Sequence, residues 1–105
     1  MTAVDARKAI KKYNSRDMLF VFNFWVDSDI TDKDVQIFCK DKILFSMGKI
    51  QHSQDEINRL IAFQYACEVK GLHNFFRNIE MVMVSQIKRQ YKENPATEYE
   101  DIKIN

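Results

Sequence analysis

Apolar side chains recur along most of this chain at spacings of three and four residues, which is the repeat of one face of an α-helix. The repeat is clearest in residues 35–47 and 57–91. In the first of these stretches the apolar positions four apart are Val35, Cys39, Ile43 and Met47. The pattern predicts a mainly all-α fold, a small helical domain or bundle with a long C-terminal helical region.

Polar residues that commonly cap helices precede the periodic stretches. They are Thr2, Ser15, Thr31 and Ser53. A serine or threonine in this position accepts a hydrogen bond from a backbone N–H of the first turn. Glu56 follows Ser53 at the capping-box spacing, and Asp34 takes the same place after Thr31. We therefore expect helices to begin at these four places.

The run MLFVFNFWV, residues 18–26, has only Asn23 as a polar interruption. Phe, Val and Trp favour strands, and a short apolar run cannot be assigned by periodicity. We expect a helix that packs into the core, because the neighbouring segments have helical patterns. The alternative is an α+β fold in which residues 18–47 form a small antiparallel sheet. Its turn, KDK, lacks the Asn-Gly or Asp-Gly pair that two-residue hairpins prefer.

The same run is too short to span a membrane, which takes about 20 apolar residues. Basic residues precede it, as in a secretion signal, but Asp5 and Asp17 interrupt that leader and no small-residue cleavage site follows. The two cysteines, Cys39 and Cys67, form no C-x-x-C pair, and a small secreted domain normally carries more. We expect reduced thiols, a cytoplasmic location and no membrane partner.

Residues 54–93 would form a helix about 60 Å long if they were unbroken. That length is too great for a compact protein of 105 residues. Either Gly71 divides the stretch into two helices, or one helix projects and meets a partner. Asn94-Pro95 ends the helical pattern. We predict a single helical domain over residues 1–93 and an acidic, flexible C-terminal tail over residues 94–105.

Composition and motifs argue against reaction chemistry. The chain is 46% apolar and 30% charged with a net charge of +1, which is typical of a soluble globular protein. It has no glycine-rich phosphate loop and no hydrolase or zinc-protease motif. A thiol–imidazole pair could join Cys39 or Cys67 to His52 or His73. Cysteine on an apolar helix face more often behaves as a small hydrophobe, so we expect no enzyme and no cofactor.

Four aspartates between positions 27 and 34 resemble a calcium loop only in part. An EF-hand loop needs glycine at its sixth position and a bidentate acid at its twelfth. Counted from Asp27, these places hold Asp32 and Phe38. Acidic residues also stabilise the positive end of a helix. We therefore expect a helix N-terminus here and no metal site.

Apolar residues exceed what a compact chain of this length readily buries. There are eight Phe, four Tyr, one Trp and five Met, and residues 81–84 read MVMV. One set of apolar positions alternates spacings of four and three, as a coiled-coil seam does. The set is Tyr65, Val69, Leu72, Phe76, Ile79 and Met83. These residues predict either a homo-oligomer or partner interface or the core of an intramolecular bundle. We expect a non-enzymatic regulatory or inhibitory protein that acts by protein–protein interaction, as a homo-oligomer.

A basic stripe near the start of the chain supports a different function. It consists of Arg7, Lys8, Lys11, Lys12 and Arg16. On one helix these residues would make a continuous positive face, which could bind the phosphates of a nucleic acid or a nucleotide. The same residues could simply form the solvated face of an amphipathic helix. Phosphate binding is the alternative function that the sequence predicts.

Overall fold

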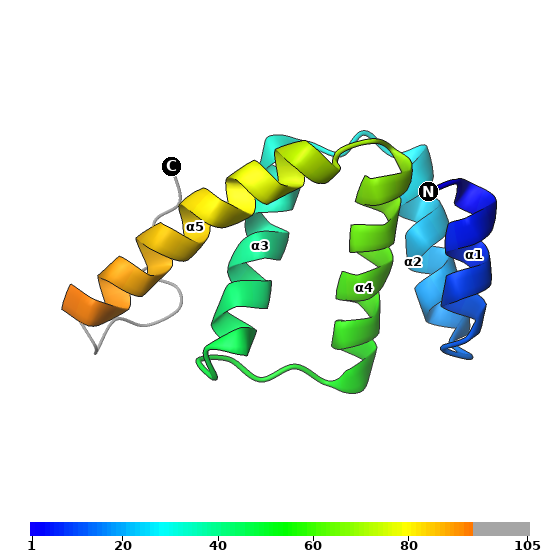
Figure 1. Cartoon of the computed structure of the whole chain (residues 1–105). Helices are drawn as coiled ribbons and strands as arrows, with labels where there is room; N and C mark the ends of the chain where they lie inside the picture. Colours follow the sequence, from blue (N-terminus) through cyan, green and yellow to red (C-terminus); the bar gives the residue numbers. More distant parts are fainter. Residues whose placement is uncertain (94–105) are drawn as a thin grey trace. The chain divides into compact units, whose positions relative to one another are not determined.

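A computed structural model describes residues 1–93 of the chain, and every regular element in this part is an α-helix (Figure 1). The helices are α1 (Ala3–Lys11), α2 (Arg16–Asp27), α3 (Asp32–Ser46), α4 (Gln54–Val69) and α5 (His73–Glu93). The predicted all-α fold is confirmed. Residues 18–46 lie in α2 and α3 and in the link between them, and Met47 is the C-cap of α3, so the alternative sheet does not form. The predicted tail, residues 94–105, lies outside the described residues.

Side-chain caps start the first four helices where the sequence predicts them. The hydroxyls of Thr2, Ser15, Thr31 and Ser53 each accept a hydrogen bond from a backbone N–H three residues later, at 3.2 Å. At Thr31 the capping box is complete, because a carboxylate oxygen of Asp34 also accepts from the Thr31 backbone N–H at 3.0 Å. The aspartates at 32 and 34 thus belong to the start of α3, which confirms the expected helix N-terminus.

Gly71 divides the long C-terminal helical stretch into α4 and α5. Its φ of +74° is left-handed, a conformation that glycine adopts without steric cost. The backbone N–H of Leu72 donates to the carbonyl of Cys67 at 2.8 Å, which closes the end of α4. A single projecting helix over residues 54–93 therefore does not form.

The described chain divides into two compact units whose segments alternate along the sequence. Unit 1 comprises residues 1–30 and 52–74, and unit 2 comprises residues 31–51 together with the described residues from 75 onward. The chain therefore passes from one unit to the other three times. The single domain over residues 1–93 stays a prediction.

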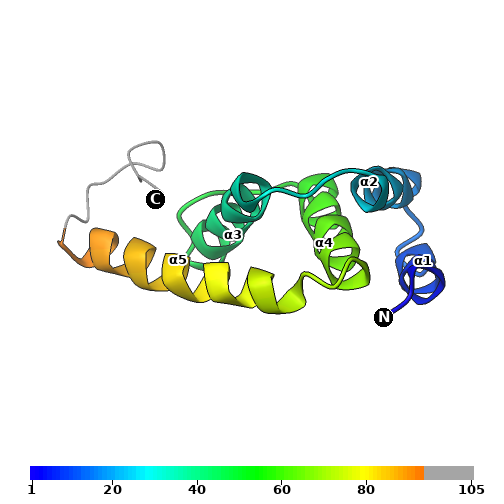
Figure 2. The ribbon, with the colours of Figure 1, turned by 90° about the horizontal axis from the view of Figure 1, so that it is seen from above.

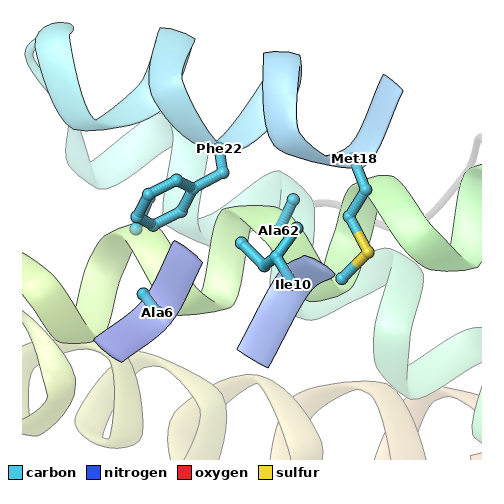
Figure 3. Packing of buried hydrophobic residues seen from close by; sticks show 6 residues of the cluster. Ala6, Ile10, Met18, Phe22 and Ala62 are labelled. Atoms are coloured by element: carbon cyan, nitrogen blue, oxygen red, sulfur yellow. The ribbon is translucent and has the colours of Figure 1, made fainter. Parts of the chain in front are cut away.

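Unit 1 is a packing of α1, α2 and α4, in which α2 lies against α4 and α1 contacts both. Met18 and Phe22 point from α2 toward Ala6 and Ile10 of α1 and toward α4 (Figure 3). The fully buried core is completed by Ala62 and Ala66 of α4. Alanines on α1 and α4 allow close approach of the helix backbones, and the larger side chains fill the remaining space.

Unit 2 is built from α3 and the greater part of α5; α5 passes in front of α3 in Figure 1 and lies beside it in Figure 2. The rings of Phe38 and Phe76 lie 5.2 Å apart between centroids. Lys42 Nζ lies 3.2 Å from a carboxylate oxygen of Glu80, in a half-exposed ion pair. Other buried side chains of this unit are Val35, Cys39, Ile43, Leu44, Met83 and Ile87.

Replacing Gly71 with alanine should lower the free energy of unfolding by about 1 kcal/mol, because a Cβ is strained at positive φ. The site has open space around it, with nothing within 4 Å of an added Cβ, so backbone strain is the only expected cost. Urea unfolding measures the change. Gly71→Asn is the control, since asparagine tolerates the left-handed region, and it should cost less. Equal free energies of unfolding for the alanine variant and the wild type would contradict the left-handed conformation of Gly71.

Candidate functional site

The six residues predicted for an oligomer interface do not share one helix. Tyr65 and Val69 are on α4, Leu72 lies in the turn, and Phe76, Ile79 and Met83 are on α5. Tyr65 and Val69 are partly buried against the core of unit 1, whereas Phe76 and Met83 are buried in the unit 2 segments. The left-handed turn at Gly71 interrupts the seam in the middle. Its periodicity is therefore accounted for, at these four positions, by packing within the chain.

Tyr65 combines partial burial with an aromatic neighbour. Burial raises the pKa of the Tyr65 hydroxyl above its ordinary value of 10.0, and the nearby Tyr13 raises it further. An open groove beside Tyr65 is lined by Met1, Ile61, Gln64, Tyr65 and Glu68. The Tyr65 phenol stays neutral well into the alkaline range and can serve as a hydrogen-bond donor there.

The basic stripe is divided between a packed arginine and exposed charges. Arg7 Nε donates a hydrogen bond to Asn23 Oδ1 at 3.1 Å, and its guanidinium carbon lies 5.7 Å from the centre of the Phe22 ring. These contacts hold Arg7 against α2. The remaining members are exposed, and they are Lys8, Lys11, Lys12 and Arg16. Arg16 begins α2, so a single helix does not carry the whole stripe.

The residues considered for catalysis lie in helices or at their ends. Cys39 of α3 and Cys67 of α4 are both buried. His52 precedes the cap of α4, and its Nδ1 lies 2.7 Å from a carboxylate oxygen of Glu56. This contact is the largest cause that lowers the pKa of Glu56 below its ordinary value of 4.5. Within residues 1–93, no cluster of three or more His, Cys, Asp or Glu side chains could hold a metal ion.

Helix α2 has an exposed aromatic face opposite its buried one. Phe20 and Phe24, one helical turn apart, are 74% and 56% exposed. The Phe24 ring meets Trp25 edge to face at a centroid distance of 5.3 Å. Trp25 in turn meets the buried Phe63 of α4 at 4.8 Å. An exposed ring is thus supported by a chain of aromatic contacts that reaches the interior of unit 1.

A second apolar surface lies on α5. Met81 and Val82 are 64% and 55% exposed, although the adjacent Met83 is buried. An open groove beside them is lined by Arg77, Glu80, Met81, Val84 and Ser85. The MVMV segment therefore has both a buried side and an apolar side in solvent. Of the described helices, none combines the length and the apolar character that a membrane crossing requires.

The α2 face is the feature that the sequence prediction missed. The sequence predicts that residues 18–26 pack in the core. This prediction is fully correct only for Met18 and Phe22. A 12-residue helix with apolar residues around most of its circumference can place only part of that surface against α1 and α4. The helical spacing of Phe20 and Phe24, two residues out of phase with Met18 and Phe22, is the signal that could have identified them.

Comparison of this chain with protein-family models, with curated proteins and with solved structures finds no significant match. The functional argument therefore rests on the exposed side chains themselves.

The raised pKa of Tyr65 predicts a specific loss of stability in alkali. Because the folded pKa exceeds the unfolded pKa, the unfolded state releases this proton first, and the free energy of unfolding falls as the pH rises above 10. Tyr65→Phe should reduce this fall, measured by urea unfolding at pH 8 and pH 11. An identical pH dependence in wild type and Tyr65→Phe would contradict the assignment.

Proposed function

We propose that this chain is a non-enzymatic regulatory or inhibitory protein, acting in the cytoplasm by binding other proteins and associating with copies of itself. The observation that carries the proposal is the exposed aromatic pair on α2. Two phenylalanines that stand in solvent one turn apart gain free energy when a partner covers them, at about 25 cal/mol per Å² of apolar surface buried. Aromatic and methionine side chains are enriched in protein interfaces for this reason.

The aromatic contacts behind the pair favour binding over chance exposure. A side chain that is already ordered loses less conformational freedom when a partner covers it. The Phe24 ring packs against Trp25, and Trp25 packs against Phe63, so the position of the exposed Phe24 ring is fixed before a partner binds. Rigid aromatic anchors of this kind commonly contribute most of the energy of an interface.

The second apolar surface extends the proposal to α5. Phe76 and Met83 of the predicted interface are already buried within the chain. The exposed neighbours Met81 and Val82 are better placed to meet a partner, and methionine adapts its shape to different surfaces. The chain thus offers an apolar pair on each of two helices.

Capture of partners by tagged full-length protein from the native host tests this function. Two double variants, Phe20→Ser/Phe24→Ser and Met81→Ser/Val82→Ser, remove one apolar pair each without touching a buried side chain. Quantitative mass spectrometry should show at least one bound protein reduced about tenfold by one of them, as expected for an aromatic or apolar anchor. Lys33→Ser/Lys92→Ser, at exposed positions outside both pairs, is the control. If both variants bind the same proteins as wild type, the proposed function is wrong.

Phosphate binding remains the second candidate function, and the four exposed basic residues favour it. Lys8, Lys11 and Lys12 lie at the C-terminal end of α1, where the helix dipole already stabilises cations without a ligand. The placement of these three lysines therefore has a structural explanation. Arg7 already contacts Asn23 and Phe22 through its guanidinium group. A nucleic acid or nucleotide would have to bind through the remaining exposed charges.

Retention on heparin as a function of salt tests the second candidate. Each phosphate contact made by a lysine contributes about one unit to the slope of log affinity against log salt. Lys8→Glu/Lys12→Glu should then reduce the slope by about two, while Lys33→Glu/Lys92→Glu should change it less. Equal retention of the two double variants would show that net charge alone governs binding and would reject a phosphate site on α1.

A further inference from the structure

The exposed face of α2 carries charges that suit one partner in particular, a second copy of the same helix. We infer that two copies of this chain associate through an antiparallel, two-fold pairing of their α2 helices, centred on Phe20 and Phe24. This inference rests on the proposed function and names the surface used for self-association. It differs from the predicted seam on α4 and α5.

The relevant side chains form one stripe along α2. At 100° per residue, Arg16 and Asp27 lie about 20° apart around the helix, at its two ends. Phe20 and Phe24 lie between them in height and slightly to one side. Asp17 is on the other edge of the two rings, where an axis at the height of Phe22 sets it level with Asp27 of an antiparallel partner but across the rings from that carboxylate. The stripe thus reads basic, aromatic, aromatic, acidic along one edge.

A two-fold axis at the height of Phe22 makes this stripe complementary to itself. In such an interface each contact occurs twice, once in each direction. Phe20 of one copy then meets Phe24 of the other, and Arg16 of each copy stands beside Asp27 of the other. A parallel pairing would place Arg16 beside Arg16 and Asp27 beside Asp27, where like charges repel. Charge complementarity therefore selects the antiparallel arrangement.

The helix dipole independently favours the antiparallel arrangement. Within its own helix, Arg16 stands at the positive N-terminal end and Asp27 at the negative C-terminal end, so both charges are placed unfavourably. In the antiparallel pair, the N-terminus of one α2 lies next to the C-terminus of the other. Each charge then faces a helix end of opposite sign as well as an opposite charge. The pairing converts two local disadvantages into favourable contacts.

The size of the surface sets the expected affinity. A helix of 12 residues is about 18 Å long, so two such helices bury less than the roughly 1,600 Å² of a standard interface. We expect association in the micromolar range. Trp25, the only tryptophan of the chain, touches Phe24 and should report the association through its fluorescence.

Sedimentation equilibrium of full-length protein from 1 to 500 µM tests the pairing. The wild-type mass should rise from 12.5 kDa toward twice that value. Phe20→Ala should weaken association about tenfold or more. Arg16→Asp and Asp27→Arg should each weaken it about tenfold by juxtaposing like charges, and the double variant Arg16→Asp/Asp27→Arg should restore it. Both charge reversals suit the helix dipole, so the monomer should stay folded, as checked by circular dichroism.

Two controls separate this inference from the proposed function. Val82→Ala and Lys33→Asp, exposed positions in unit 2, should leave self-association unchanged. A monomer at every concentration, a dimer lost with Val82→Ala and kept with Phe20→Ala, or a double charge reversal that fails to restore association would each overturn the α2 pairing. Loss of partner proteins from the serine variants on capture would still support the binding of other proteins in any of these cases. A monomer at every concentration would in addition remove self-association from the proposed function.

Discussion

The close approach of α2 to α4 is the interaction on which unit 1 depends. Alanines at positions 62 and 66 leave room on α4 for the large side chains of Met18 and Phe22, and α1 closes the same core with Ala6 and Ile10. Larger residues at the alanine positions would have to push α2 outward, because a packed interior has no spare volume. Once α2 is fixed in this way, its opposite face is fixed as well, and Phe20 and Phe24 have no place within unit 1.

An apolar helix with two faces is therefore the central feature of the molecule. One face of α2 packs in the core. The other face remains in water, and Trp25 and Phe63 pack behind it. Chains seldom retain such a surface without use, because exposed apolar patches favour aggregation as well as specific binding. The proposed binding function and the proposed self-association both follow from this one arrangement, and both differ from the coiled-coil seam that periodicity predicts.

Local features of the fold could be predicted from the sequence, whereas features set by distant contacts could not. The four N-caps and the helical class were correct because they depend on residues within one turn of each other. The break at Gly71 was one of two open alternatives, and only the left-handed turn decides between them. The helical spacing separates Phe20 and Phe24 from Met18 and Phe22, but which of these two faces is exposed depends on where α4 packs, some 40 residues away in sequence. The functions assigned to the seam and the basic stripe stay predictions.

The alternation of the two units along the chain has a consequence for synthesis on the ribosome. Residues 1–30 emerge first, but the α4 alanines that complete their core follow only after all of residues 31–51. At about 5 to 20 residues per second, roughly 2 to 9 s separate Ile30 from the end of unit 1 at Asn74. During that interval the side of α2 that packs on α4 is uncovered on the nascent polypeptide, together with the exposed aromatic face. We therefore expect a chaperone that binds short aromatic segments to bind this protein during translation, before the core of unit 1 is complete.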